Sequence, residues 1–286
     1  MSGIRWYGYL FKLFLRDVIS FFIFIFLIIK NSIIREKEKG VRILVYHSIN
    51  DADKKNDTIR MTVPPKLFSK QLDYLVSCGY NIVSFDDMVE YISGEKEVKG
   101  NILALTFDDG FKDNFHNACK ILKSKGLTAT YFLSFDYVNS GKSFAWVKER
   151  SSWAESLVWD EVSLMVLQGM AIGSHTLSHL NLGGISDDGL LDKEIRGSKQ
   201  MIEEKAGIPV KYFSYPIGCR GSYNKKTETI IRQAGYKAAC VNIFGENKKG
   251  ANLFELKRTR IDWNDTLFKF RMKLEGAYDW VDQNYA

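Results

Sequence analysis

Short apolar runs of strand length alternate with longer amphipathic stretches along the chain after residue 40. A stretch such as Phe111–Gly126 repeats apolar side chains at helical spacing and ends at a glycine, which is typical of an amphipathic helix. The apolar runs predict strands at Ile43–His47, Ile82–Ser84, Ile102–Phe107, Thr128–Leu133, Met170–Gly173, Val210–Tyr215, Lys237–Asn242 and Thr259–Ile261. The stretches between most of them predict helices, for example at Pro65–Ser77, Asp86–Ile92, Trp159–Gln168, Asp187–Ala206 and Lys225–Ala234. This alternation predicts an α/β fold with a largely parallel sheet that is closed or nearly closed on itself.

The beginning of the chain follows a different pattern. Val18–Ile29 is an almost unbroken apolar run, flanked by Arg16 and Asp17 on one side and Lys30 on the other. A membrane-spanning helix needs about 20 apolar residues, so this run can cross a bilayer only with the help of neighbouring apolar residues. A cleaved signal peptide is not favoured, because no small-residue cleavage site follows the run. A core helix of the domain is the alternative, but the charged flanks favour a membrane anchor.

The length of the chain fits one catalytic domain behind this anchor. Of 286 residues, we assign 1–40 to a hydrophobic membrane-attachment segment and 41–286 to a single α/β domain. Basic residues lie on both sides of the apolar run, so the side of the membrane stays undecided. The four cysteines have no CxxC spacing, which favours free thiols. The net charge of +6 is modest and the basic residues are scattered, so we expect no nucleic acid partner.

Two short polar motifs stand where predicted strands end. Asp108 and Asp109 follow the third predicted strand, and His175 and His179 follow the fifth. The carboxyl ends of parallel strands share one edge, so we expect these side chains to meet there. One aspartate and two histidines supply three ligands for a divalent metal and leave a position open, as in catalytic zinc sites. Each motif alone also has an ordinary explanation, a turn or an incidental histidine pair, but their joint occurrence favours a metal hydrolase.

These motifs resemble those of a known family. Thr106–Gly110 (TFDDG) resembles the first motif of the polysaccharide deacetylases, carbohydrate esterase family four, and His175–His179 (HTLSH) resembles their HxxxH metal motif. Phe213–Gly218 (FSYPIG) is similar to the third motif in the variant of exopolysaccharide deacetylases, and Leu44–Ile49 (LVYHSI) to the first strand of that branch. The resemblance covers most of the chain after residue 40. It implies a distorted, incomplete (β/α) barrel, a divalent metal, most simply Zn²⁺, and an N-acetylated glycan as substrate.

The resemblance also implies a division of roles. Asp109, His175 and His179 would bind the metal, which polarises the acetyl carbonyl and acidifies water. Asp108 would accept the proton of the attacking water. The backbone N–H of Ile217, the residue after the proline of the third motif, would stabilise the oxyanion.

The chain departs from the usual family pattern at two positions. Most members carry a late histidine as the general acid, but no histidine follows His179. Most also carry an arginine that orients the base, at the position where this chain has Ser214. We predict that His47 replaces the acid and that Arg260, in the basic cluster near the last strand, is the partner of Asp108. The alternatives for His47 are a structural role or the orientation of the base.

We therefore predict a metal-dependent hydrolase that removes N-acetyl groups from N-acetylhexosamine units of a cell-surface polysaccharide or its lipid-linked precursor. An aromatic segment, Phe135–Leu157, could stack on sugar rings through Tyr137, Phe144, Trp146 and Trp153, or could simply pack on the domain. Two other functions stay open. One is a non-catalytic glycan-binding protein on the deacetylase fold, which the missing late histidine permits. The other is an amidohydrolase that acts on a small non-sugar substrate.

Overall fold

A computed structural model describes residues 3–33, 40–51, 60–140, 144 and 154–281 of the chain. The strands are β1 (Arg42–Tyr46), β2 (Tyr80–Ile82), β3 (Asn101–Phe107), β4 (Thr130–Leu133), β5 (Ala171–Ser174), β6 (Tyr212–Ser214), β7 (Ala238–Cys240) and β8 (Thr259–Arg260). The helices are α1 (Gly3–Ile33), α2 (Pro65–Ser77), α3 (Phe85–Ser93), α4 (Lys120–Ser124), α5 (Trp159–Leu167), α6 (Asp188–Asp192), α7 (Ser198–Ala206), α8 (Lys225–Gln233) and α9 (Leu267–Leu274). Two π-helical turns, η1 (Asn114–Cys119) and η4 (Lys193–Gly197), and a 3-10 turn, η3 (Leu182–Gly184), complete the elements.

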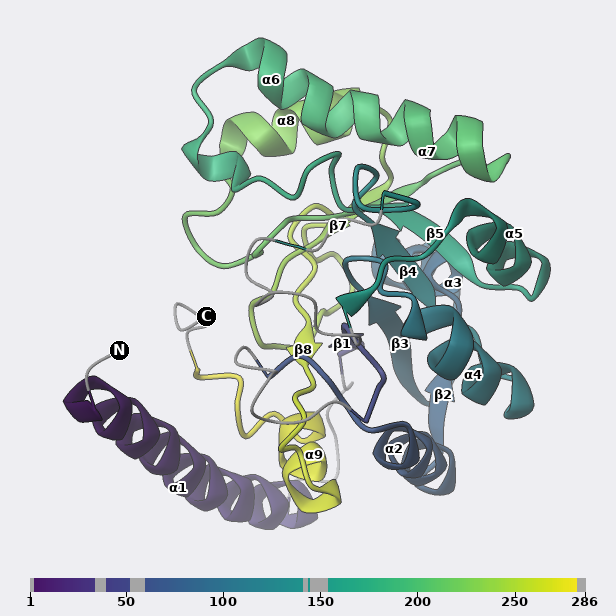
Figure 1. Cartoon of the computed structure of the whole chain (residues 1–286). Coiled ribbons are helices and arrows are strands. Elements are labelled where there is room, and N and C mark those ends of the chain that lie inside the picture. Colours follow the sequence, from purple (N-terminus) through teal and green to yellow (C-terminus); the bar gives the residue numbers. More distant parts are fainter. Residues whose placement is uncertain (1–2, 34–39, 52–59, 141–143, 145–153, 282–286) are drawn as a thin grey trace.

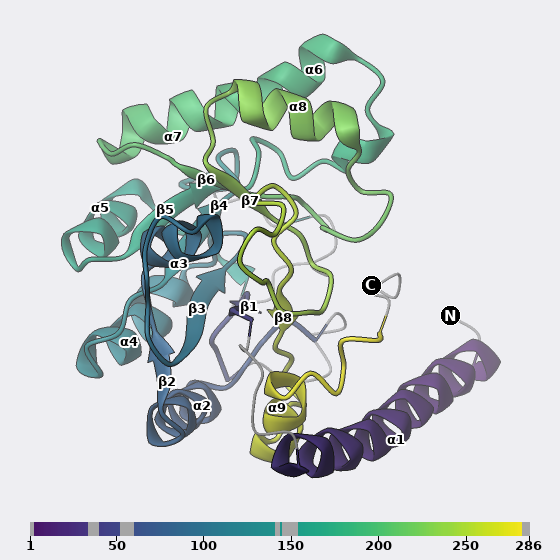
Figure 2. The same cartoon turned by 180° about the vertical axis from the view of Figure 1, so that it is seen from behind.

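The strands form one parallel sheet with the order β7-β6-β5-β4-β3-β1-β8, and β2 also pairs with β3. Figures 1 and 2 show the sheet curled on itself, with helices α2 to α8 around its outside. The two end strands, β7 and β8, form no ladder with each other in the described part of the chain, and a single parallel bridge, from Cys240 to Leu256, joins β7 to the segment before β8. The expected distorted, incomplete (β/α) barrel is confirmed.

The strands are apolar because the sheet is covered on both sides, as parallel sheets are. Every residue of β1 and β4 is buried, and a column of stacked rings from Tyr46, Phe107 and Tyr131 fills part of the core. All eight predicted strands are present. The second one lies two residues earlier than expected, because Ser84 begins α3 instead: its hydroxyl accepts a hydrogen bond from the Asp87 N–H, as an N-cap does.

The N-terminal helix α1 packs against α9 by its middle part and extends away from the barrel on the N-terminal side, as both views show (Figures 1 and 2). Phe24 is buried in this contact, which also includes Tyr278. No helix among the described residues is both long enough and apolar enough to traverse a bilayer. The four cysteines are free thiols, as expected.

Candidate active site and metal centre

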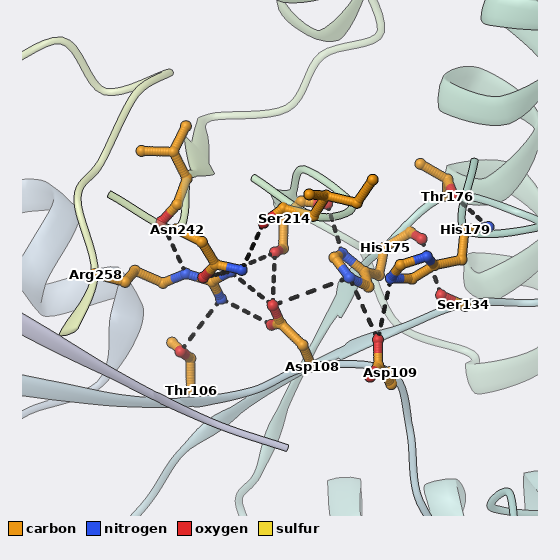
Figure 3. Close-up of polar contacts among 12 residues, drawn as sticks. Thr106, Asp108, Asp109, Ser134, His175, Thr176, His179, Ser214, Asn242 and Arg258 are labelled. Carbon is orange, nitrogen blue, oxygen red and sulfur yellow. Dashed lines mark hydrogen bonds and ion pairs between the residues drawn. The ribbon is translucent and has the colours of Figure 1, made fainter. Parts of the chain in front are cut away.

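The two aspartates of the TFDDG motif leave the end of β3 in different directions. The backbone N–H of Asp108 still donates to the carbonyl oxygen of Tyr46, at 3.1 Å. The chain then turns sharply, since Asp109 has a φ of 77° and Gly110 a φ of 88°. Glycine adopts a positive φ freely, whereas the same conformation strains an aspartate. As a result the two adjacent carboxylates face different partners, except that His175 lies between them and within reach of both (Figure 3).

Asp109, His175 and His179 form one group, which we call the metal cluster. One ligand atom from each residue lies within 4.8 Å of the others. Asp109 Oδ1 is 3.5 Å from His175 Nε2 and 3.3 Å from His179 Nε2. Asp109 and His175 are buried, and only 8% of the His179 side chain is exposed. The structure thus brings together the three residues that the sequence marks as metal ligands.

The two histidines are held by hydrogen bonds outside the cluster. His175 Nδ1 lies 2.7 Å from the carbonyl oxygen of Ser214, at the end of β6. An Nδ1–H donated to that oxygen leaves Nε2 unprotonated and directed at Asp109, which is the tautomer that binds metal. The His179 N–H donates to Thr176 Oγ1 at 3.0 Å. Thr176 and His179 both have positive φ values, 68° and 57°, so this turn is strained and depends on the structure around it.

The surroundings of Asp109 fit a metal ligand. Both carboxylate oxygens are buried, and neither has a partner with hydrogen-bond geometry among the residues that the structure describes. A buried carboxylate without donors is costly unless a cation compensates its charge. Burial by itself would raise the pKa of Asp109, but the neighbouring imidazoles, His179 first, hold that pKa below its ordinary value. Two imidazole nitrogens and one carboxylate oxygen suit a borderline metal such as Zn²⁺.

Asp108 belongs to a second group, the base cluster, with Arg258, Ser214 and Asn242. Arg258 donates from Nη1 to Asp108 Oδ1 at 2.7 Å and from Nη2 to Oδ2 at 2.6 Å. The Ser214 hydroxyl also donates to Oδ2, at 3.1 Å, and Arg258 Nη2 donates to Asn242 Oδ1 at 2.9 Å. Burial by itself would raise the pKa of Asp108, but Arg258 and then His175 hold it well below its usual range. Asp108 is therefore kept ionised in a fixed orientation (Figure 3).

The prediction that Arg260 is the partner of Asp108 is wrong, because Arg258 takes that place. Arg260 pairs with Asp262 instead, with 2.8 Å between Nε and Oδ1. The register explains the difference: Arg260 is level with Val45 and Thr106, near the strand ends, and its side chain pairs with Asp262, which follows the strand. Arg258 enters two residues earlier, and its long side chain passes Thr106 inside the barrel to reach Asp108.

His47 lies at the end of β1, beside the two aspartates. It is 4% exposed, and its Nδ1 has no hydrogen-bond partner in the described part of the chain. Burial lowers the pKa of His47, and the charges of Asp109 and Asp108 oppose that shift. Asn114, the first residue of η1, fixes this strand end by donating from Nδ2 to the His47 carbonyl oxygen at 2.6 Å. The charges of both carboxylates thus act on the ring of His47. Its role as the general acid stays a prediction.

Ile217 occupies the turn after β6. Its φ is 64°, a value that is rare for a β-branched residue, and 39% of the residue is exposed. Its carbonyl oxygen accepts a hydrogen bond from Asn242 Nδ2 at 3.0 Å, which fixes the turn to the base cluster. Strain of this kind is held by the surrounding structure and is concentrated at functional sites.

The aromatic segment is described only in part. Phe144 is buried against the site: its ring stacks on Tyr137 at 3.9 Å between centroids and meets His179 edge-on at 5.6 Å. This contact supports the packing role for these two rings. Trp146 and Trp153 lie outside the described residues.

Comparison with known proteins decides the family. A family model named polysaccharide deacetylase matches residues 95–239, which hold the metal cluster, Asp108 and the turn at Ile217. The chain belongs to the polysaccharide deacetylase family. A relative from Bacillus subtilis, named as polysaccharide deacetylase YxkH, is 26% identical over 226 residues, which are 79% of this chain and 73% of that protein.

Solved structures share the fold. The Streptococcus pyogenes deacetylase PplD, in complex with acetate, has a TM-score of 0.71 and 24% identity, with 82% of this chain and 98% of that chain covered. A polysaccharide deacetylase from Bacillus cereus has a TM-score of 0.68 and 25% identity over 82% and 69% of the two chains. IcaB from Ammonifex degensii has a TM-score of 0.68 and 19% identity over 84% and 98%. This chain is therefore a deacetylase of the family that uses a divalent metal, and the metal cluster is where its own residues could hold one.

Sequence reasoning missed three residues that hold these two clusters in place. Arg258 was visible only as one member of a basic cluster, and it lies outside the matched span of residues 95–239. Asn242 appeared only as the end of a predicted strand. Glu194, in η4, gave no signal at all. Its buried carboxylate accepts hydrogen bonds from Leu177 N at 3.1 Å, Ser178 N at 3.0 Å and Ser178 Oγ at 2.5 Å, and so fixes the turn between the two histidines.

Proposed function

We propose that this deacetylase removes N-acetyl groups from N-acetylhexosamine units of a cell-surface polysaccharide or its lipid-linked precursor, with a metal held by Asp109, His175 and His179. The observation that carries the proposal is the contrast within one motif. Asp109 is buried without hydrogen-bond donors among the described residues, as a metal ligand is, while Asp108 beside it is fully held by donors. Such a pair supplies a ligand and a base at one strand end.

Each side chain then has a distinct task. A divalent metal supplies Lewis acidity, which polarises the acetyl carbonyl and makes water more acidic. Asp108, kept ionised by Arg258, accepts the proton of the attacking water. We assign stabilisation of the developing oxyanion to the backbone N–H of Ile217, in a turn that Asn242 holds in place. We assign Zn²⁺ to the cluster because two histidines and one carboxylate, with open positions, are the usual ligands of catalytic zinc.

The amine must leave protonated, and we assign that proton to His47. It is the one imidazole of the chain outside the metal cluster that lies beside both aspartates, since His116 is on the surface and pairs with Glu161. His47 acts as an acid only in its protonated form, which burial disfavours and the charges of Asp109 and Asp108 favour. Its Nδ1, which has no hydrogen-bond partner in the described part of the chain, is the nitrogen left to carry that proton.

The substrate class rests on the family and its relatives, whose names refer to polysaccharide deacetylation. We further assign the catalytic domain to residues 41–286, because each proposed site residue lies within that range.

An acetate-release assay tests this function. Purified protein is stripped of metal, reloaded with Zn²⁺, and offered N-acetylated hexosamine polymers and oligomers beside small N-acetylated amines that are not sugars. We expect metal-dependent release of acetate from the glycans. Metal-dependent release of acetate from the non-sugar amides alone would show that the substrate is a small amide and not a glycan. Glycan binding without acetate release would reject the proposed function.

The role of His47 has a test of its own. His47→Ala should keep its metal, lose turnover on the N-acetyl amide, and retain much more activity on an activated acetate ester, whose leaving group needs no proton. Equal losses on the amide and the ester would reject the acid role and favour orientation of the base. Loss of metal or of thermal stability would point to a structural role.

A further inference from the structure

One face of α1 carries a row of large apolar side chains that nothing in the described structure covers. The row consists of Phe11, Phe14, Leu15, Ile19, Phe22, Ile25, Phe26 and Ile29, each between 37% and 66% exposed. These positions recur at intervals of three and four residues, so they form a single stripe along the helix. We call this stripe the α1 apolar face. A soluble domain rarely exposes so many aromatic and branched side chains side by side.

The opposite face of α1 is fixed to the domain. Asp17 Oδ2 is 3.3 Å from Lys269 Nζ of α9, and Asp17 Oδ1 accepts a hydrogen bond from Tyr278 at 3.0 Å. Ser20 Oγ accepts from Trp280 Nε1 at 3.2 Å, and Phe24 is 3% exposed. The spacing of Asp17, Ser20 and Phe24 places them on one side of the helix. The α1 apolar face is therefore presented outward by the same contacts that bury its opposite side.

The exposed surface continues from α1 onto the C-terminal part of the domain. Phe268 of α9 is 51% exposed, and its ring lies 6.2 Å from Phe21 and 5.6 Å from Phe24 between centroids. Trp280 is 47% exposed, but its indole N–H donates to Ser20 on the domain side of α1, so it is not part of the stripe. An apolar stripe of this kind is typical of helices that lie in the interface of a bilayer.

Basic residues lie near both ends of the α1 apolar face and on α9. Lys12 is exposed on α1, Lys30 is partly exposed at its other end, and Arg271 is exposed on α9. The acid of α1, Asp17, is engaged with Lys269 and Tyr278 on the domain side. An apolar stripe with basic residues at its edges complements a bilayer of anionic lipids, which attracts lysine and arginine at its surface.

We infer that the α1 apolar face, with Phe268, docks on the surface of an anionic lipid bilayer, with α1 lying in the plane of the membrane. The domain would then be held at the membrane surface by α1 and α9 together. This inference concerns a surface that the catalytic chemistry does not use, so it stands independently of the proposed function.

Vesicle binding by the full chain tests the inference. The probes are vesicles of phosphatidylcholine alone and of phosphatidylcholine mixed with phosphatidylglycerol. The variant is Phe22→Glu/Phe26→Glu, which changes two side chains that are 66% and 62% exposed and so leaves the fold intact. Its matched control is Val76→Glu/Leu167→Glu, which places the same charges at two exposed apolar positions, 55% and 81%, outside this surface.

We expect the unchanged protein and the control to bind the anionic vesicles, more weakly at high salt, and the variant to bind at least about tenfold more weakly. An alkaline carbonate wash should release the bound protein, as it does proteins that do not cross the bilayer. Acetate release from a soluble substrate should be equal in all three proteins, which separates this result from the proposed function.

Three results would overturn the inference. The first is equal vesicle binding by the variant and the control. The second is protein that resists the carbonate wash, which would mean that α1 crosses the bilayer. The third is a dimer that the variant dissociates, without vesicle binding by any of the proteins, which would assign the α1 apolar face to a second copy of the chain.

Discussion

The metal cluster and the base cluster begin at adjacent aspartates of one strand end and are nevertheless built in opposite ways. Around Asp108, Arg258 and Ser214 satisfy both carboxylate oxygens with three hydrogen bonds. Around Asp109, both oxygens are buried without such bonds in the described structure. The first arrangement is complete with the atoms of the protein, whereas the second has the buried, donor-poor carboxylate that a bound cation would compensate. Adjacent residues of the same type thus receive different chemistry from the segments that fold against them.

Removal of a histidine from the metal cluster should have the largest effect. His175→Ala or His179→Ala leaves two ligands, so we expect loss of bound metal together with loss of acetate release by about a thousandfold or more. Metal analysis of the purified variants and the acetate assay measure the two effects. His116→Ala, at an exposed histidine, is the control and should change neither. Full metal occupancy in either cluster variant would contradict the assignment.

Removal of the charge of Asp108 should separate the two clusters. Asp108→Asn keeps the shape of the side chain and an oxygen for Arg258 but removes the base, so turnover should fall by about a hundredfold or more while the metal stays bound. Turnover and metal content are measured on the same preparation. Near-normal turnover would exclude Asp108 as the base. Loss of metal would show that Asp108 also takes part in metal binding.

The two arginines near β8 offer a direct comparison. Arg258→Gln breaks a fully buried ion pair, so we expect a lower melting temperature, a cost of about 3–5 kcal/mol in the free energy of unfolding, and turnover reduced about tenfold or more. Arg260→Gln removes an ion pair with Asp262 at a partly exposed side chain. It should lower the free energy of unfolding and the turnover far less. Arg258→Lys keeps the charge but cannot make both hydrogen bonds, so it should restore stability better than turnover. Equal effects at positions 258 and 260 would reject the corrected assignment.

The smallest effect is expected from the residue that holds the histidine turn. Glu194→Gln removes the negative charge that three donors share, so the turn between His175 and His179 should loosen and metal affinity should fall about tenfold. Competition with a chromogenic chelator measures this affinity without reference to activity. Glu204→Gln makes the same change on an exposed part of α7, where Glu204 contacts Gln200, and should leave the affinity unaltered. An unchanged metal affinity in Glu194→Gln would show that the turn between His175 and His179 keeps its conformation without the charge of Glu194.

Part of this protein is determined by local sequence. The alternation of apolar runs and amphipathic stretches predicts all eight strands, because the periodicity of burial is a property of each segment by itself. The motifs TFDDG and HTLSH predict the metal cluster, because a ligand set needs only side chains that follow strands whose ends share one edge of a parallel sheet. The apolar run near the N-terminus likewise predicts a helix that attaches the chain to a membrane. The membrane attachment itself stays a prediction.

The tertiary structure alone decides which partner each strand end receives. Arg258 and Asp108 are far apart in the sequence, and they meet because β8 pairs with β1, which in turn pairs with β3. The choice of Arg258 over Arg260 depends on the register of β8, and a strand of only 2 residues carries too little hydrophobic alternation to fix that register by itself. Asp108 and Asp109 are interchangeable in the sequence, and a turn with positive φ gives them different neighbours. Sequence therefore supplies the reactive side chains, and packing between distant segments fixes the charge and the orientation with which each one acts.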